Sequence, residues 1–287
     1  MNINILGSGG ALPFPRALCR CVNCEQARDE GIPYARTGPS MYIPEDGGIL
    51  FDTPEEIRFQ FEREGIKELK HIFFTHWHPD HTQGMRIIEN INHVYAHEQR
   101  KSPINIWLPE TRVDEYGDND FERWCPTLWY FVKMGWAVIR EVDDRLPIKL
   151  EKVTVTPVNF NRADRDRYGF LTEVNNKRIM YAPCSIFGLT LDAYYNDLDY
   201  LIMELGWPGD TQKIRAKLPK KHPWHDHVSF EENLEIIKLT RPKQTILTHI
   251  DGTRHRANDG NHADLCKMVR KTCLNIEIAY DGMKLPI

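Results

Sequence analysis

Three histidines and one aspartate lie inside a stretch of six residues, at His76, His78, Asp80 and His81. Imidazole nitrogens and carboxylate oxygens are donors that borderline metal ions such as Zn²⁺, Fe²⁺ and Mn²⁺ prefer in proteins. In an extended segment His76 and His78 point to the same side, and a following turn can bring Asp80 and His81 to a neighbouring position. The cluster therefore predicts a site for a divalent metal, with donors that could serve two adjacent ions.

A second cluster consists of three cysteines, Cys19, Cys21 and Cys24, also inside six residues. Three thiolates at this spacing can fill three of the four tetrahedral positions around one Zn²⁺, and the fourth ligand must come from elsewhere. Arg20 and Asn23 interrupt any apolar face here, so the three thiols do not match ordinary core residues. We expect a structural zinc site at this cluster.

Helix signals precede the histidine motif. The run Thr-Pro-Glu-Glu at 53–56 offers a capping residue, a proline at the first helical position and a capping-box glutamate. It predicts a helix that continues to Glu64, with Ile57 and Phe61 facing inward and Phe59 as a further candidate. A second capping box, from Ser229 to residue 232, predicts the start of another helix.

Strand-like segments recur in both halves of the chain, with helical patterns between them. They lie at residues 3–6, 40–43, 48–52, 71–75, 153–159, 169–174, 178–182, 200–205, 244–248 and 276–280. Two strand-rich halves with interleaved helices predict an α/β fold of two packed sheets with helices outside. We expect residues 1–287 to form a single domain.

The stretch 110–147 is unusually rich in aromatic residues. They include Trp124, Trp129, Tyr130, Phe131 and Trp136. Such a density favours either an insertion that caps a site or an ordinary secondary core, and the residues leave both interpretations open.

Composition excludes several classes of protein. The 287 residues are 41% hydrophobic, which is enough for a packed core and excludes disordered and fibrous classes. A formal charge of −4 provides no global field for nucleic acid or an anionic membrane, so we expect neither partner. No apolar run approaches the roughly 20 residues of a membrane span. The seven cysteines are an odd number, which suits a reducing compartment, so we expect a cytoplasmic protein. A homodimer is compatible with this composition.

The His-x-His-x-Asp-His motif at 76–81, followed by Gly84, resembles the signature of the metallo-β-lactamase superfamily. The opening Ile-Leu-Gly-Ser-Gly at 5–9, Asp52 after a strand, and Leu-Thr-His ending at His249 extend this resemblance over nearly the whole chain. The resemblance implies an αββα sandwich of two mixed sheets, with the metal site at the sheet edges. It also implies that His249 is a late metal ligand.

Other segments narrow the resemblance to two branches of that superfamily. The cysteine cluster at 19–24 and the closing run at 278–283 are similar to phosphoribosyl cyclic phosphodiesterases of phosphonate breakdown and to PqqB-type proteins of pyrroloquinoline quinone biosynthesis. The runs at 181–183 and 249–251 look nearer to the PqqB type.

Two positions depart from the hydrolases of the family. Those enzymes supply a further histidine near residues 158–162, where this chain has none, and a bridging aspartate where this chain has Cys184. A Cys184 thiolate would be a softer metal ligand, and an inert buried cysteine is the alternative. We therefore expect one tightly held metal in this site rather than two.

The resemblance also implies roles for single residues. His227 matches a glycine-histidine-x-serine segment in which the histidine faces the substrate, so we expect it to act as an acid. Asp80 is expected to be both a ligand and a catalytic residue. His255 is the expected fourth ligand of the cysteine cluster, because the family places its loop near that cluster, and Asp251 and His262 compete with it.

Three functions remain open at this point, of which the first is the primary hypothesis and the other two are alternatives. The first is a metal-dependent hydrolase that cleaves a phosphodiester or cyclic phosphate of a small molecule with a metal-activated water, while His227 protonates the leaving group. The second, implied by the PqqB-type resemblance, is an iron-dependent oxygenase or hydroxylase in cofactor or peptide-derived metabolite biosynthesis, with His76, His78 and His249 around one Fe²⁺. The third is a non-catalytic metal-binding protein.

Overall fold

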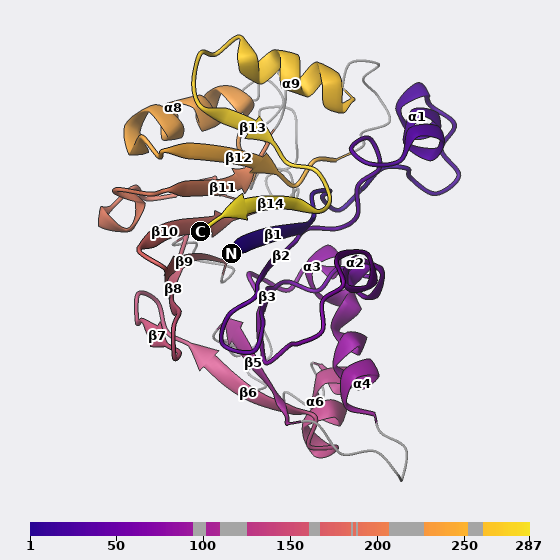
Figure 1. The fold of residues 1–287 in the computed structure, drawn as a ribbon, viewed down its shortest axis with the longest axis vertical. Helices are drawn as coiled ribbons and strands as arrows, with labels where there is room; N and C mark the ends of the chain where they lie inside the picture. The colour runs from indigo at the N-terminus through magenta and orange to yellow at the C-terminus, as the bar shows by residue number, and fades with distance from the viewer. Residues whose placement is uncertain are drawn as a thin grey trace, which may run out of the picture.

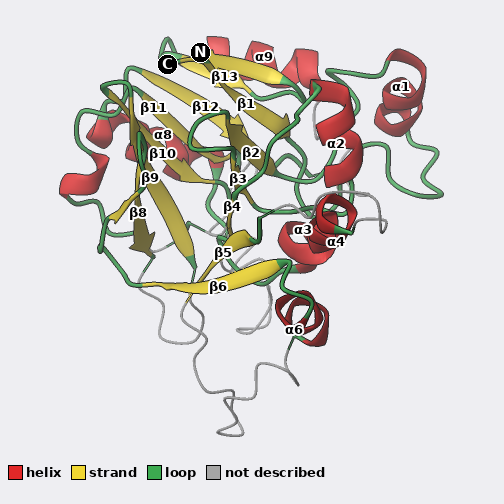
Figure 2. Ribbon diagram, turned by 60° about the horizontal axis from the view of Figure 1, so that its bottom comes forward, coloured by secondary structure: helices red, strands yellow, loops and turns green. Residues whose placement is uncertain are grey.

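The computed structural model describes residues 1–93, 102–109, 125–160, 167–184, 186–187, 189–206, 227–251 and 261–287. Two sheets pack face to face, and helices cover their outer faces, so the layers follow the order αββα (Figures 1 and 2). The expected fold class is confirmed.

The first sheet has seven strands among the described residues. Their order is β14 (Met283–Pro286), β1 (Asn2–Gly7), β2 (Ser40–Ile43), β3 (Ile49–Phe51), β4 (His71–Phe73), β5 (Ile104–Pro109) and β6 (Ala137–Val142). The strands from β3 to β6 pair in parallel, whereas β14, β1, β2 and β3 pair antiparallel.

The second sheet also has seven described strands. Their order is β13 (Ile276–Ile278), β12 (Gln244–Thr248), β11 (Tyr200–Glu204), β10 (Lys177–Ala182), β9 (Tyr168–Val174), β8 (Thr154–Asn159) and β7 (Ile148–Lys149). Here the strands from β10 to β13 are parallel. Each sheet therefore combines a parallel half with an antiparallel half.

Helices flank both sheets. They are α1 (Val22–Glu30), α2 (Ile57–Glu64), α3 (Pro79–Thr82), α4 (Ile87–Asn92), α6 (Pro126–Lys133), α8 (Phe230–Thr240) and α9 (His262–Arg270), with 3₁₀ turns η1 (Gln83–Arg86) and η2 (Ala193–Tyr195). Apolar residues of α2, α4 and α6 pack on the first sheet, and those of α8 and α9 pack on the second. None of the described helices is both long and apolar enough to cross a membrane.

The core between the sheets is aromatic at its centre. The ring of Phe51 lies 5.4 Å from those of Phe73 and Phe170 and 5.6 Å from that of Tyr181. All four side chains are almost completely buried, and each such burial contributes about 1.5–3 kcal/mol. This packing fixes the strands whose ends carry the polar motifs.

The helix expected from residue 54 begins later, at Ile57. Thr53 instead joins the histidine motif, because its N–H donates to the His81 carbonyl at 2.7 Å and its carbonyl accepts from Gly84 N at 2.8 Å. The expectation for Phe59 is also wrong, since that side chain is 62% exposed. Two residues rotate a helix by about 200°, so Phe59 faces away from the side that buries Ile57.

The second capping box is confirmed. The Ser229 hydroxyl accepts from the Glu232 N–H at 3.0 Å, and the Glu232 carboxylate accepts from the Ser229 N–H at 2.7 Å. This pair fixes the start of α8.

The described part of the aromatic-rich segment contains α6 and β6. Leu128, Phe131 and Trp136 are buried against the outer face of the first sheet, and β6 pairs with β5. Residues 110–124 lie outside the described residues, so a cap over a site stays a prediction.

Candidate metal centre and cysteine cluster

The residues of the predicted metal site follow the carboxyl ends of parallel strands. β4 ends shortly before the motif at 76–81, β10 ends shortly before Cys184, and β12 ends directly before His249. Because the carboxyl ends of parallel strands lie at one edge of a sheet, each sheet gathers its polar residues at one edge. A contact between His81 and His249 joins the two edges. We refer to His76, His78, Asp80, His81, Cys184 and His249 together as the metal centre.

One set of donors consists of Asp80, His81 and His249. Asp80 Oδ2 lies 3.3 Å from the Nε2 atoms of both His81 and His249, and these two Nε2 atoms are 3.3 Å apart. A metal ion with bonds of about 2.0–2.2 Å holds adjacent donors roughly 3.0–3.5 Å apart. The three atoms therefore fit one face of the coordination shell of a single ion.

A second set consists of His76, His78 and Cys184, whose donor atoms lie within 4.8 Å of one another. His76 Nε2 is buried and has no hydrogen-bond partner among the described residues, an arrangement that is costly unless another group binds there. Burial lowers the pKa of His76 to about 3, so it presents a neutral imidazole. A metal ion fits this set as well.

Cys184 belongs to both sets. Its sulfur also lies within 4.8 Å of the His81 and His249 donor atoms, and the side chain is only 4% exposed. The structure thus places a thiol between the sets, where the resemblance implied an aspartate. The grouping differs from the implied iron site of His76, His78 and His249, because His249 lies with His81.

Charge within the centre follows from these contacts. Burial alone would lower the pKa of His81, but the Asp80 and Asp52 carboxylates raise it well above its usual value. Burial opposes charge on His249 too, and Cys184 raises its pKa well above the usual value. A bound cation would take the place of the protons that these imidazoles carry.

Asp52 orients one of the imidazoles. Its fully buried carboxylate accepts from the Thr75 N–H at 2.8 Å, and its Oδ2 lies 2.8 Å from His81 Nδ1. This contact fixes the His81 ring so that Nε2 faces Asp80 and His249. Sequence reasoning noted Asp52 only as part of a resemblance; its place directly after an apolar strand was the available signal.

His227 stands beside the centre. Its ring centroid lies 5.9 Å from that of His249, and its Nδ1 lies 2.5 Å from Glu204 Oε2. Burial would lower the pKa of His227, but Glu204 raises it to about 9. Glu204 was missed by sequence reasoning, although an acidic residue at the end of the apolar strand 200–205 is unusual. Its Oε1 also accepts from the Ile186 N–H at 2.8 Å, which ties it to the segment after Cys184.

The loop after β1 packs directly on His249. A Cβ atom at Gly10 would lie 2.6 Å from His249 Nδ1, so this close approach requires glycine. The Leu12 N–H donates to Asp251 Oδ1 at 2.7 Å. The same loop continues to Cys19, and it therefore connects the metal centre with the cysteine cluster.

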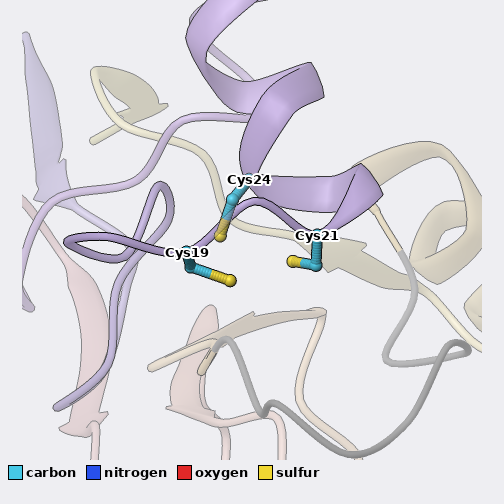
Figure 3. Close-up of side chains that lie close together, drawn as sticks. All are labelled: Cys19, Cys21 and Cys24. Atoms are coloured by element: carbon cyan, nitrogen blue, oxygen red, sulfur yellow. The ribbon is translucent and has the colours of Figure 1, made fainter.

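The cysteine cluster, Cys19, Cys21 and Cys24, lies at the start of α1, away from both sheets (Figure 1). The three sulfur atoms point toward one another and lie within 4.8 Å (Figure 3). A hydrogen bond from the Cys21 N–H lowers the pKa of Cys19 to about 7, whereas burial raises that of Cys24 to about 11. Three converging thiols are the donors that Zn²⁺ binds in structural sites.

The fourth ligand of this cluster is not among the described donors that gather there. Asp251 accepts from Leu12, and His262 Nδ1 lies 2.9 Å from an Arg36 nitrogen, so both competitors are engaged elsewhere. His255 lies outside the described residues and stays a prediction.

Comparisons with known proteins place this chain among relatives of similar sequence and similar fold. The chain is 29% identical over 317 residues to the coenzyme PQQ synthesis protein B of Methylococcus capsulatus, with 99% of each chain covered. It superposes on a diphosphatase of the PhnP family with a TM-score of 0.72 and 22% identity, covering 99% of this chain and 96% of that one. Zn²⁺-bound PqqB from Methylobacterium extorquens gives a TM-score of 0.70 and 17% identity, with 100% of both chains covered.

The two solved structures share the fold with this chain. The sequence model of the beta-lactamase superfamily domain matches residues 48–250, which include the motif at 76–81, Cys184 and His249. The chain therefore belongs to the metallo-β-lactamase superfamily.

Proposed function

We propose that this chain is an iron-dependent oxygenase or hydroxylase, similar to PqqB, that acts on a small intermediate of cofactor or peptide-derived metabolite biosynthesis. The observation that carries the proposal is the donor triangle of Asp80, His81 and His249. Two histidines and one carboxylate on one face of an ion are the ligand set of non-haem Fe(II) oxygenases. This set leaves the other coordination positions of the iron open. Similarity over 99% of the chain to a coenzyme PQQ synthesis protein supports a role in coenzyme synthesis.

The remaining donors favour this reaction over hydrolysis by two metals. Cys184 supplies a soft thiolate where a hard oxygen would best bridge two hydrolytic ions. The sequence has no histidine from residue 98 to 221, so that stretch offers no third imidazole to the His76 and His78 set. We expect the set of Asp80, His81 and His249 to fill first.

Three residues around the centre would have separate roles in this reaction. Iron, when bound, would supply binding of O₂ and electron transfer. Asp52 holds His81 in the orientation that a ligand needs, through the 2.8 Å contact to Nδ1. His227, fixed by Glu204, holds a proton beside the centre and can donate it to a substrate atom there.

Hydrolysis of a phosphodiester is the second candidate. The observation in its favour is the pair of His227 and Glu204, since a protonated imidazole can neutralise an alkoxide leaving group. Zn²⁺ or Mn²⁺ would then supply a water of lowered pKa. The fold shared with a diphosphatase is compatible with this reaction.

We also propose that the cysteine cluster binds a structural Zn²⁺ through Cys19, Cys21 and Cys24, with His255 as the fourth ligand. The convergence of the three sulfur atoms supports this assignment. A small-molecule substrate and a homodimer stay predictions.

Anaerobic loading with single metals tests the function. Protein loaded with Fe²⁺ and exposed to nitric oxide, an O₂ surrogate, should show the EPR signal of a high-spin iron nitrosyl. Asp80→Ala and His81→Ala should lose this signal, because each removes a corner of the donor triangle. The matched control is His93→Ala. His93 is an exposed histidine outside the centre, and its ring centroid lies 5.9 Å from that of Trp136.

The same samples distinguish the second candidate. Cleavage of bis(p-nitrophenyl) phosphate by Zn²⁺- or Mn²⁺-loaded protein without O₂, together with no nitrosyl signal from Fe²⁺-loaded protein, would replace the oxygenase by the hydrolase. A signal that persists in Asp80→Ala and His81→Ala would assign iron to other donors.

A further inference from the structure

The cysteine cluster contains a pair of thiols with unequal access. Cys21 is exposed and is the residue that precedes the first turn of α1, whereas Cys24 lies inside that turn with 0% exposure. Their sulfur atoms lie within 4.8 Å of each other. The side chain of Cys21 makes no capping hydrogen bond to the helix. Its thiol instead contacts the thiols of Cys19 and Cys24.

The surroundings hold Cys24 in place. Its sulfur accepts from the Arg16 N–H at 3.4 Å, and its side chain packs with Phe14, Cys19 and Ala27. One thiol of the pair is therefore fixed and shielded, and the other is free to meet a reactant in solvent. Thiol–disulfide exchange needs this combination, because one sulfur must be attacked first and the other must displace the product.

We propose that, when the cluster holds no metal, Cys21 and Cys24 form a disulfide by exchange with a low-molecular-weight disulfide such as oxidised glutathione. The Cys21 sulfur attacks one sulfur of that molecule, its S–S bond breaks, and one glutathione leaves as a thiol. The Cys24 sulfur then attacks the Cys21 sulfur, and the second glutathione leaves as a thiol.

The exchange balances without another reactant. The cysteine pair loses two electrons and two protons, and oxidised glutathione gains both. Cys19 keeps its thiol. Because a bound Zn²⁺ would occupy the sulfur atoms of Cys21 and Cys24, metal and disulfide exclude each other at this cluster. The inference depends on the cluster alone and not on the reaction of the metal centre.

Peptide mapping of the full chain tests this proposal. Metal-stripped protein is incubated with oxidised glutathione, alkylated, and digested without reductant. We expect a Cys21–Cys24 disulfide, while exposed Cys273 carries glutathione or remains alkylated. Zn²⁺-loaded protein should form the disulfide at least about tenfold more slowly, because its sulfur atoms are coordinated.

Variants identify the order of attack. The double variant Cys19→Ser/Cys24→Ser, which has no second thiol near Cys21, should stop at a stable mixed disulfide of glutathione with Cys21. Cys19→Ser alone should still form the Cys21–Cys24 bond. Circular dichroism checks that each variant is folded. If a variant is unfolded, the comparison of metal-stripped with Zn²⁺-loaded wild-type protein still tests the proposal. Three alkylated thiols in the metal-stripped protein, a bond that includes Cys19, or equal rates with and without Zn²⁺ would overturn it.

Discussion

The metal centre and the cysteine cluster gather similar donors by opposite means. The centre draws its donors from segments that follow three strands, whose ends lie between residues 73 and 248 of the sequence. Four of its donors, His76, His81, Cys184 and His249, are buried. The cluster draws three thiols from six consecutive residues at the start of a peripheral helix, with one thiol exposed. Its apolar support is small, consisting of Phe14 and Ala27 with parts of Tyr34 and Ala35.

This difference indicates whether the protein fold positions the metal ion or the metal ion stabilises the fold. At the centre, packing of the sheets places the donors, and residues such as Asp52 hold them before any ion binds. At the cluster, little packing is available, so the free energy of metal binding must itself stabilise the local fold. Removal of metal should therefore cost the region around the cluster more stability than the sheets around the centre.

The largest effect is expected from Asp52→Ala. The change removes the buried partner of His81 Nδ1 and the acceptor of the Thr75 N–H, so unfolding should become easier by about 3–5 kcal/mol. Metal affinity at the centre should fall about 10–100-fold. Urea unfolding and competitive metal titration measure the two effects.

Asp264→Ala is the matched control for Asp52→Ala. Its carboxylate is exposed and pairs only with exposed Lys267 among the described contacts of its side chain, so stability should change by less than about 0.5 kcal/mol. Equal effects of the two substitutions would mean that the centre is not held by its buried carboxylate.

An intermediate effect is expected from Cys21→Ser. With Zn²⁺ at about a hundred times its dissociation constant, a bound ion stabilises the folded protein by about 2.7 kcal/mol, and the variant should lose that contribution. In chelator-treated protein the variant and the wild type should unfold alike. Metal at the centre should remain, because the described donors of the centre and of the cluster are different residues.

Cys273→Ser serves as the control, since its thiol is exposed and outside the cluster. Thermal unfolding with and without Zn²⁺, and elemental analysis of each variant, measure the result. An unchanged melting temperature for Zn²⁺-loaded Cys21→Ser would remove the structural role of the cluster.

The same contrast explains what could be predicted from the sequence. The thiols of the cluster and the motif at 76–81 are local patterns, and an apolar strand directly precedes the motif. The contact between His249 and His81 could not be predicted from a local pattern, because it depends on how the edges of two sheets meet. The role of Glu204 was hidden for the same reason, since its partner His227 follows 23 residues later.

Local signals failed where tertiary contacts outweighed them. The Thr-Pro start at residue 53 is a strong helix signal, yet the backbone of Thr53 bonds to His81 and Gly84, and the helix begins at Ile57. The N–H and the carbonyl of Thr53 therefore make hydrogen bonds to the motif and not within a helix. Propensity thus predicted the element correctly and its boundary wrongly.

The smallest effect concerns acid and the side of the molecule that carries the cluster. His262 Nδ1 lies 2.9 Å from an Arg36 nitrogen, and its ring lies 6.5 Å from Tyr34, which packs on the cluster. Burial and the Arg36 charge lower the pKa of His262 to about 4, whereas an unfolded histidine titrates near 6.5. Between these values the unfolded chain binds a proton that the folded chain does not, so stability should fall as pH decreases through this window.

The expected total loss between pH 7 and pH 4.5 is about 1 kcal/mol. One proton could cost at most about 1.4 kcal/mol for each pH unit between the two pKa values, and the loss is smaller than this limit because the ring is partly exposed to water. Urea unfolding of chelator-treated protein at pH 7 and pH 4.5 measures it in the wild type and in His262→Gln. The glutamine keeps an acceptor for Arg36 but does not titrate, and carboxylates contribute equally to both proteins. The loss should therefore be smaller in His262→Gln, and an equal loss in both would show that acid does not act through the contact beside the cysteine cluster.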